Sequence, residues 1–228
     1  MNVVIFGATG MVGRGVLLEC LDDARVERVL VISRRTVEVS HPKLREIIHQ
    51  DFFDFTDIQS QFAALGACFF CLGVSSIGIS EREYDHLTYD LTLAAAKALV
   101  ATTTRLTFCY VSGEGTDSTE QGRLAWARIK GRTENALLRM PFKAAYMFRP
   151  GYIQPLRGIR SKTQWYQLLY GVIGSLYPLL RRILPRYVTT TVNIGRAMIE
   201  VASTGYPTQI LFSPDINRLA AVGGFRAS

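Results

Sequence analysis

Short runs of β-branched and aromatic residues alternate along this chain with longer segments in which apolar residues recur every three or four positions. The runs predict strands and the longer segments predict helices, because side chains alternate across a strand but repeat every 3.6 residues in a helix. The predicted strands cover residues 2–6, 28–33, 44–49, 67–72, 105–112, 143–148 and 209–213. The predicted helices cover residues 11–22, 56–64, 81–101, 122–139, 163–183 and 192–202. Alternation of helices with continuously apolar strands predicts an α/β fold with a parallel sheet covered on both faces.

The order of these elements also indicates where a ligand binds. In an open parallel sheet, ligands bind at the carboxyl ends of the strands, at the point where the strand order reverses. The chain of 228 residues contains no internal repeat, low-complexity tract or obvious linker. Its 48% hydrophobic and 20% charged residues suit a globular protein and exclude a disordered chain. We therefore predict one domain over residues 1–228.

The segment after the first predicted strand carries three glycines at intervals of three residues. It consists of Gly7, Ala8, Thr9, Gly10, Met11, Val12 and Gly13, and helix-compatible sequence follows it. A strand, a glycine-rich turn and a helix in this order are typical of a dinucleotide-binding loop. Gly7 would permit the tight turn, Gly10 the approach of a pyrophosphate, and Gly13 the packing of the helix on the sheet. We predict that this loop and the N–H groups at the helix start bind the cofactor; the alternative is a turn that binds nothing.

The end of the second predicted strand indicates which dinucleotide is bound. That strand ends in Ser33-Arg34-Arg35, where an acidic residue would bind the ribose 2′-hydroxyl of NAD. A guanidinium instead holds a 2′-phosphate through paired charge-assisted hydrogen bonds and stacks on adenine. The sequence therefore favours NADP(H), with Arg34 and Arg35 as its ligands, unless both arginines are simply solvated. The loops after the third and fourth strands supply further candidate contacts: Asp51, Phe52, Leu72, Gly73 and Val74.

The four cysteines and three histidines form no pattern typical of a metal site. Cys68 and Cys71 lie in one apolar run, and residues three apart point to opposite faces of a strand, so the two thiols cannot share one ion. We interpret them as core residues of a protein in a reducing compartment. A predicted core strand at the very start of the sequence leaves no room for a signal peptide, and we expect a cytoplasmic location.

Four segments together give the chain a family resemblance: residues 8–13, Cys71-Leu72-Gly73, Tyr110-Val111-Ser112 and Arg149-Pro150-Gly151. With these segments the chain resembles the atypical short-chain dehydrogenase/reductase superfamily over nearly its whole length. More closely, it is similar to small bacterial proteins labelled NAD-dependent epimerase/dehydratase and to the related Tat-interacting protein group. The resemblance implies a Rossmann-like, doubly wound parallel sheet with strand order 3-2-1-4-5-6-7. It also implies a nicotinamide near the ends of strands four to six, with Pro150 among its contacts.

The chain departs from the family pattern at one catalytic position. The resemblance implies a serine at the end of strand five and Tyr-x-x-x-Lys on the next helix. Ser112 and Lys130 match the serine and the lysine, but Trp126 occupies the position of the tyrosine. An indole N–H donates a hydrogen bond but cannot deliver a proton at neutral pH. Ser112 and Lys130 remain candidate catalytic and cofactor-binding residues, although Lys130 can also be an exposed helix lysine. Tyr152 is the first candidate to replace the tyrosine, and the alternatives are Tyr84, Tyr89 and Tyr110.

Positive charge is concentrated in one part of the chain. Residues 122–186 hold thirteen lysine and arginine residues and a single acid, Glu134. The other residues hold thirteen basic and eighteen acidic side chains, although the whole chain has a formal charge of +7. Such a field attracts an anionic small-molecule substrate, the cofactor's phosphates or an anionic surface, unless it is a solvated arginine-rich face. We expect no nucleic-acid partner, because no recognition motif accompanies the charge.

An uncharged segment, residues 163–180, lies within the predicted substrate-side segment 152–190. A bilayer span needs roughly 20 mainly apolar residues, and this shorter segment is diluted by glycine, glutamine and proline, so we exclude a transmembrane helix. Three interpretations of residues 163–182 remain: a lid over an apolar substrate, a homodimer surface, and a helix in peripheral contact with a membrane.

Two functions stay open on the sequence. The first is an NADP-dependent oxidoreductase or epimerase that acts on a small anionic or apolar substrate with non-standard acid–base residues. The second is a non-catalytic NADP(H)-binding protein in which the cofactor tunes binding to a partner or membrane. Ser112 and Lys130 favour the first, and Trp126 favours the second.

Overall fold

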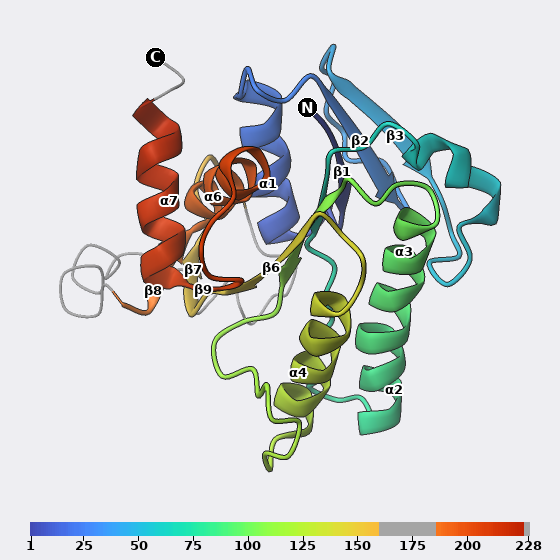
Figure 1. The fold of residues 1–228 in the computed structure, drawn as a ribbon, viewed down its shortest axis with the longest axis vertical. Helices are drawn as coiled ribbons and strands as arrows, with labels where there is room; N and C mark the ends of the chain where they lie inside the picture. Colours follow the sequence, from blue (N-terminus) through green and yellow to red (C-terminus); the bar gives the residue numbers. More distant parts are fainter. Residues whose placement is uncertain (160–185, 226–228) are drawn as a thin grey trace.

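The chain folds around a seven-stranded parallel sheet, as Figure 1 shows for the computed structural model. The structure describes residues 1–159 and 186–225. The strands of the sheet are β1 (Asn2–Phe6), β2 (Arg28–Ser33), β3 (Leu44–Ile48), β4 (Ala67–Phe70), β5 (Thr107–Val111), β6 (Ala144–Arg149) and β9 (Ile210–Phe212). Two shorter strands, β7 (Tyr152–Gln154) and β8 (Val188–Thr190), pair in parallel with each other.

The strand order is β3-β2-β1-β4-β5-β6-β9, which confirms the predicted order because β9 is the predicted seventh strand. β1 pairs with β2 on one side and with β4 on the other, for example Val3 with Val29 and with Ala67. The chain therefore leaves β1 toward one edge of the sheet and returns to its other side. The carboxyl ends of β1, β2 and β4 meet at this reversal, where a ligand is expected.

Helices cover both faces of the sheet. They are α1 (Met11–Asp22), the 3₁₀ helix η1 (Thr56–Phe62), α2 (Glu81–Asp85), the π turn η2 (His86–Asp90), α3 (Leu91–Val100), α4 (Ala125–Leu138), α6 (Thr191–Thr204) and α7 (Ser213–Phe225). In Figure 1, α1, α6 and α7 lie on one side, and α2, α3 and α4 lie on the other. The doubly wound α/β fold predicted from the sequence is therefore confirmed.

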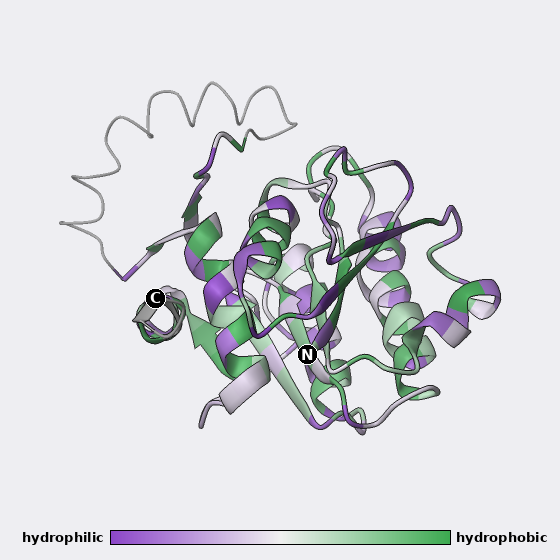
Figure 2. Cartoon of the chain, turned by 90° about the horizontal axis from the view of Figure 1, so that it is seen from above, coloured by the Kyte–Doolittle hydropathy of each residue, from purple (hydrophilic) through white to green (hydrophobic). Residues whose placement is uncertain are grey.

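Alternate residues of β1 enter two separate cores. Val3 and Ile5 pack in the core beneath α1 and α6, whereas Val4 and Phe6 pack in the core beneath η1, α3 and α4. Figure 2 shows hydrophobic residues gathered on the strands inside the molecule, with more hydrophilic residues on the surrounding loops. Because both faces of the sheet are buried at its centre, the inner strands β1, β2, β4 and β5 are mainly apolar, which is the pattern visible in the sequence, whereas the half-buried edge strand β3 contains Arg45 and Glu46.

The two cysteines of the apolar run lie on opposite faces, as the strand pattern predicts. Cys68 belongs to the core beneath α3, and Cys71 packs against the core beneath α1. Burial raises the pKa of the Cys71 thiol to about 12, so this thiol stays protonated at neutral pH. Within the described ranges, no group of three or more histidine, cysteine, aspartate and glutamate residues is placed to hold a metal ion.

Some elements differ from those predicted. The predicted helix 81–101 is helical without a break from Glu81 to Val100, but its middle turn, η2, is a π turn. The buried Thr92 hydroxyl of α3 donates to the carbonyl of Thr88 in η2 at 2.6 Å. The predicted helix 122–139 begins only at Ala125, and the sequence pattern did not predict β7, β8 or α7. The predicted helix 163–183, and with it most of the substrate-side segment, lies outside the described residues.

Candidate nucleotide-binding site

The glycine loop after β1 is packed tightly against its surroundings. Gly7 has a φ of +82°, and a Cβ atom there would lie 2.7 Å from the carbonyl carbon of Cys71. A Cβ atom at Gly13 would lie 2.2 Å from the Gly7 carbonyl oxygen, so only glycine allows α1 to approach the loop this closely. At Gly10 the corresponding distance is 3.3 Å and the residue is exposed. Gly7 and Gly13 therefore build the loop, and Gly10 presents its backbone to the outside.

The start of α1 offers free backbone donors beside this loop. Gly10 is the N-cap residue, no side chain caps the helix, and no acidic residue lies in its first turn. Met11, Val12 and Gly13 form that turn, so their N–H groups have no intrahelical acceptor. Unpaired N–H groups and the positive end of the helix dipole bind anions such as a pyrophosphate. The predicted loop therefore has the geometry of a phosphate cradle.

A valine at Gly10 is expected to weaken NADPH binding at least roughly tenfold, because it pushes a phosphate away from charge-assisted N–H contacts. The backbone accepts the change, since the Gly10 φ of −85° suits any residue, but its Cβ would lie 3.3 Å from the Gly7 carbonyl oxygen, a close contact that the loop must relieve by a shift of a few tenths of an ångström. Gly13→Ala is the contrasting variant: its clash with Gly7 should lower the melting temperature itself. Fluorescence titration and thermal melts measure the two effects. Unchanged NADPH binding by Gly10→Val would show that the loop is only structural.

Two adjoining pockets lie beyond the loop. The nucleoside pocket, about 360 Å³, is lined by Gly7, Thr9, Ile32, Ser33, Arg34, Arg35, Phe52 and Leu72. The arginine pocket, about 380 Å³, is lined by Ala8, Thr9, Gly10, Arg14, Leu18, Arg35, Thr36, Val37, Glu38, Arg157, Gly158 and Ile159. Thr9 and Arg35 line both, so the two pockets meet at the carboxyl end of β2. Their volumes leave room for a nucleoside in one pocket and a phosphate attached to it in the other.

The predicted cofactor residues fall into two groups. Arg34 and Arg35 are exposed at these pockets, and neither makes an ion pair with the rest of the described chain. Phe52 is buried at the wall of the nucleoside pocket, and Leu72 lines it as well. Asp51 lies beside the pocket rather than in its lining, and its Oδ1 accepts the Phe53 N–H at 2.9 Å. Two more predicted contacts, Gly73 and Val74, lie further along the loop after β4, outside the lining of either pocket.

Sequence reasoning missed several residues of the arginine pocket, and three of them are charged. Arg14 directly follows Gly13, and this adjacency was a usable signal; its Nη1 donates to the Val37 carbonyl. Glu38, at a φ of +53°, brings one negative charge to the pocket. Arg157 comes from the segment after β7, and no local sequence signal connects it to β2.

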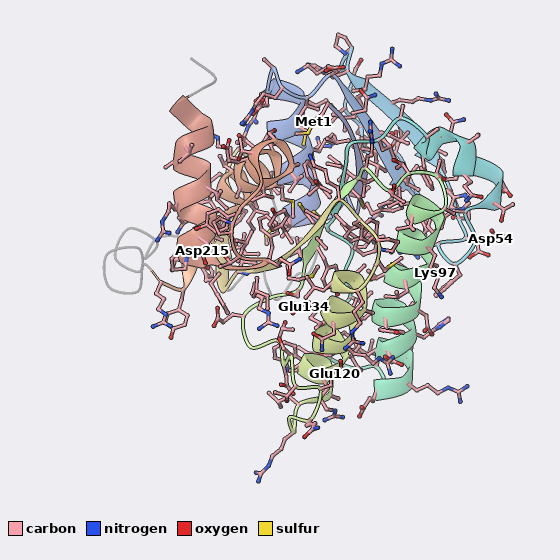
Figure 3. All side chains as sticks on the ribbon, in the orientation of Figure 1. Met1, Asp54, Lys97, Glu120, Glu134 and Asp215 are labelled. Carbon is pink, nitrogen blue, oxygen red and sulfur yellow. The ribbon has the colours of Figure 1, made fainter. Side chains whose placement is uncertain are left out.

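The candidate catalytic serine belongs to a buried charge cluster. Ser112, just after β5, donates from Oγ to Glu134 Oε1 at 2.5 Å, and its Oγ also lies 3.1 Å from the Phe148 carbonyl oxygen. Glu134 is fully buried on α4 near the centre of the molecule (Figure 3). Arg149 at the end of β6 pairs with it through Nε at 3.0 Å and through Nη2. Because a hydroxyl carries one proton, Ser112 has none left to donate to a substrate.

Lys130 lies one helical turn before Glu134 on α4. Its Nζ donates to the Ser112 carbonyl, and the side chain is half-buried rather than exposed. Desolvation by burial lowers the pKa of Lys130 to about 8, although the negative charge of Glu134 favours the ammonium and raises the pKa in part. Lys130 therefore lies beside Ser112, as predicted, with an ammonium that loses its proton unusually easily.

The other predicted residues lie around this cluster. The half-buried Trp126 packs beside Gly115, and its indole N–H makes no hydrogen bond within residues 1–159 and 186–225. Tyr152 is in β7, and its hydroxyl donates to Gln154 Oε1 at 2.9 Å. Pro150 is buried, and its carbonyl accepts the Glu114 N–H at 2.9 Å, which ties the loop after β5 to the end of β6.

Known proteins share this fold, and several are similar in sequence over most of the chain. No protein-family model matches the chain. The mitochondrial protein fmp52 of Emericella nidulans is 30% identical over 188 residues, which are 79% of each chain. The chain belongs to the fmp52 family. Further curated fmp52 proteins match at 26–27% identity, among them the mitochondrial fmp52-2 of Aspergillus terreus.

Several solved structures have a fold similar to that of this fmp52-family chain. An oxidoreductase of the short chain dehydrogenase/reductase family from Burkholderia thailandensis superposes with a TM-score of 0.66 and 14% identity, covering 100% of this chain and 98% of that one. The NAD⁺ complex of the Bordetella bronchiseptica enzyme WbmF superposes with a TM-score of 0.63 and 17% identity, covering 99% and 78%. The chain thus has the NAD(P)-binding Rossmann fold of short-chain dehydrogenases/reductases and epimerases.

The predicted cytoplasmic location is wrong. The curated fmp52 relatives that cover most of the chain are named as mitochondrial proteins. The sequence argument rested on the lack of a secretory signal peptide, which does not distinguish the cytoplasm from an organelle. In the part of the chain that the structure describes, each helix is too short or too polar to cross a membrane.

Proposed function

We propose that this chain binds NADP(H) along the carboxyl ends of β1, β2 and β4. The observation that carries the proposal is the pair of adjoining pockets beside an uncapped helix start. The pyrophosphate binds at Gly10 and the first turn of α1, the adenosine binds in the nucleoside pocket against Phe52, and the 2′-phosphate points into the arginine pocket. The WbmF complex with NAD⁺ supports a nucleotide in this fold.

The preference for NADP(H) over NAD(H) rests on the charges at the end of β2. Glu46 on β3 is an acid near this point, but its carboxylate accepts from the Thr36 hydroxyl and the Val37 N–H and lies 3.2 Å from the Ser33 hydroxyl. It is therefore occupied by the protein itself and is a poor acceptor for a ribose 2′-hydroxyl. The lining of the arginine pocket has three arginines and one acid, Glu38. The two acids that pair with Arg157, Glu19 and Asp22, lie outside that lining, so the wall that a phosphate would face is mainly basic.

The buried charge cluster of Ser112, Glu134 and Arg149 supports a binding protein without tyrosine-based catalysis. Bound NADPH supplies a hydride, so carbonyl reduction also needs a proton donor close to the substrate oxygen. Ser112 gives its proton to a buried partner, and Trp126 has no ionisable group. We infer that the chain holds NADP(H) without the usual carbonyl reduction of its superfamily.

A second candidate function rests on Lys130. An ammonium with a pKa of about 8 is matched to proton transfer near neutral pH, and Lys130 lies one helical turn from Trp126. In this case the chain is an NADP-dependent oxidoreductase or epimerase in which Lys130 takes the role of the missing tyrosine. Tyr152 is the next residue to test.

A panel of simple aldehydes and ketones with NADPH separates these two functions. The unmodified protein is expected to bind NADPH but to oxidise it no faster than a blank. Trp126→Tyr places a hydroxyl beside Lys130 and should raise the rate, since acid–base assistance contributes roughly 10²–10⁴-fold. Trp126→Phe is the matched control without a hydroxyl and should stay inactive.

Efficient reduction by the unmodified protein would overturn the binding-only proposal. A rate that then falls as pH rises through about 8 would assign the proton to Lys130, because a general acid must be protonated. Absence of NADPH binding in a direct titration would overturn both candidates. Likeness to the Tat-interacting proteins, a homodimer and membrane contact of residues 163–182 stay predictions.

A further inference from the structure

Arg157 reaches the arginine pocket from the opposite half of the chain. It follows β7, whereas the other two arginines of the pocket, Arg14 and Arg35, come from α1 and from the end of β2. Its backbone has a φ of +59°, a left-handed conformation that is uncommon for a residue with a side chain. The neighbouring Leu156 N–H donates to Thr191 Oγ1 at 3.2 Å, which fixes this segment to the start of α6.

Ion pairs orient the Arg157 guanidinium. Its Nη1 lies 3.1 Å from Glu19 Oε1 and 2.7 Å from Asp22 Oδ2, both on α1. The Nε and Nη2 groups have no partner among the described residues. A guanidinium has five N–H donors, so two can stay on the acids while the others face an anion in the pocket.

We propose that Arg157 is a specificity residue that binds the adenosine 2′-phosphate together with Arg35 and Arg14. The proposal rests on the proposed NADP(H) function. It adds to the phosphate-binding residues an arginine that comes from outside the nucleotide-binding half of the chain. Arg35 lines both pockets, so a phosphate on the ribose of a nucleoside beside Phe52 enters the arginine pocket opposite Arg157. Glu19 and Asp22 then act as positioning residues, because they hold the guanidinium at the pocket wall.

Adenosine 2′,5′-bisphosphate and AMP are the probes, because they differ only in the 2′-phosphate. Arg157→Met is expected to weaken the bisphosphate about tenfold and to leave AMP unchanged, since a charge-assisted hydrogen bond at a partly exposed position contributes about this factor. Isothermal titration at fixed ionic strength measures both affinities, and a thermal melt confirms folding. Arg157→Asn is the second variant, because asparagine tolerates a positive φ.

Arg196→Met is the matched control. Arg196 pairs with the same carboxylate, Glu19, through Nε at 2.9 Å, but it does not line the arginine pocket. It should therefore leave both affinities unchanged. If Arg157→Met and Arg196→Met weaken bisphosphate binding equally, the loss is assigned to Glu19 and the proposal is overturned. Unchanged bisphosphate binding by the Arg157 variants would overturn it as well. If the unmodified protein itself binds AMP as tightly as the bisphosphate, the NADP(H) preference fails as well.

Discussion

Replacing Glu134 with alanine is expected to lower the free energy of unfolding by about 3–5 kcal/mol, the range for removing one partner of a buried ion pair. Glu134 is fully buried and Arg149 is 7% exposed, so the guanidinium would be left without its counter-charge in the protein interior. The Ser112 hydroxyl would lose its acceptor as well. Urea denaturation, followed by circular dichroism, measures the loss.

Two further variants test this explanation. Glu81→Ala removes an acid that pairs with Arg128 at 2.6 Å, but Glu81 is 58% exposed, so the loss should stay below about 1 kcal/mol. Joint replacement of Glu134 by leucine and Arg149 by methionine should recover much of the stability, because no buried charge remains. A loss of less than about 1 kcal/mol in Glu134→Ala would contradict the cost we assign to the unpaired Arg149.

The same cluster shows why the sequence could not define the chemistry at this site. Ser112 and Lys130 were found at the positions that the family pattern gives them, and the structure brings the two together. The hydrogen-bond partners of this site could not be predicted, because Glu134 and Arg149 lie far from Ser112 in the sequence and only the fold brings them together. Glu134 stood out as the single acid in a basic segment, but composition alone did not show that it is buried.

Most of the fold was predictable because its signals are local. The inner strands of the sheet are mainly apolar, whereas the edge strand β3 carries two charged residues in its middle, Arg45 and Glu46, and glycines mark the turn after β1. β7 and β8 have three residues each, too few for a periodic pattern, and they pair only in three dimensions. The helix α7 begins with Ser213-Pro214-Asp215, which is a recognisable start signal, but Gly223 and Gly224 near its end weakened the helical pattern.

Reversing the charge of both arginines after β2 is expected to abolish the preference for NADPH. In the double variant Arg34→Glu with Arg35→Glu, the ratio of NADPH affinity to NADH affinity should fall roughly 10²-fold. Each of the two lost charge-assisted hydrogen bonds contributes about tenfold at the lower limit of its usual strength. NADH affinity should be almost unchanged, because a glutamate after β2 can accept from the ribose 2′-hydroxyl. Fluorescence titrations at one ionic strength measure both, since salt screens exposed charges.

The control for this variant has the same change in net charge at a distance from the site. Arg28→Glu with Arg105→Glu alters two exposed arginines near the amino ends of β2 and β5, and it should leave the affinity ratio unchanged. The single variants Arg34→Glu and Arg35→Glu then separate the contributions of the two residues to the NADPH preference. Arg35 lines both pockets and Arg34 only the nucleoside pocket, so Arg35→Glu should account for most of the loss. An unmodified protein that binds NADH as tightly as NADPH would show that both arginines are solvated surface charges.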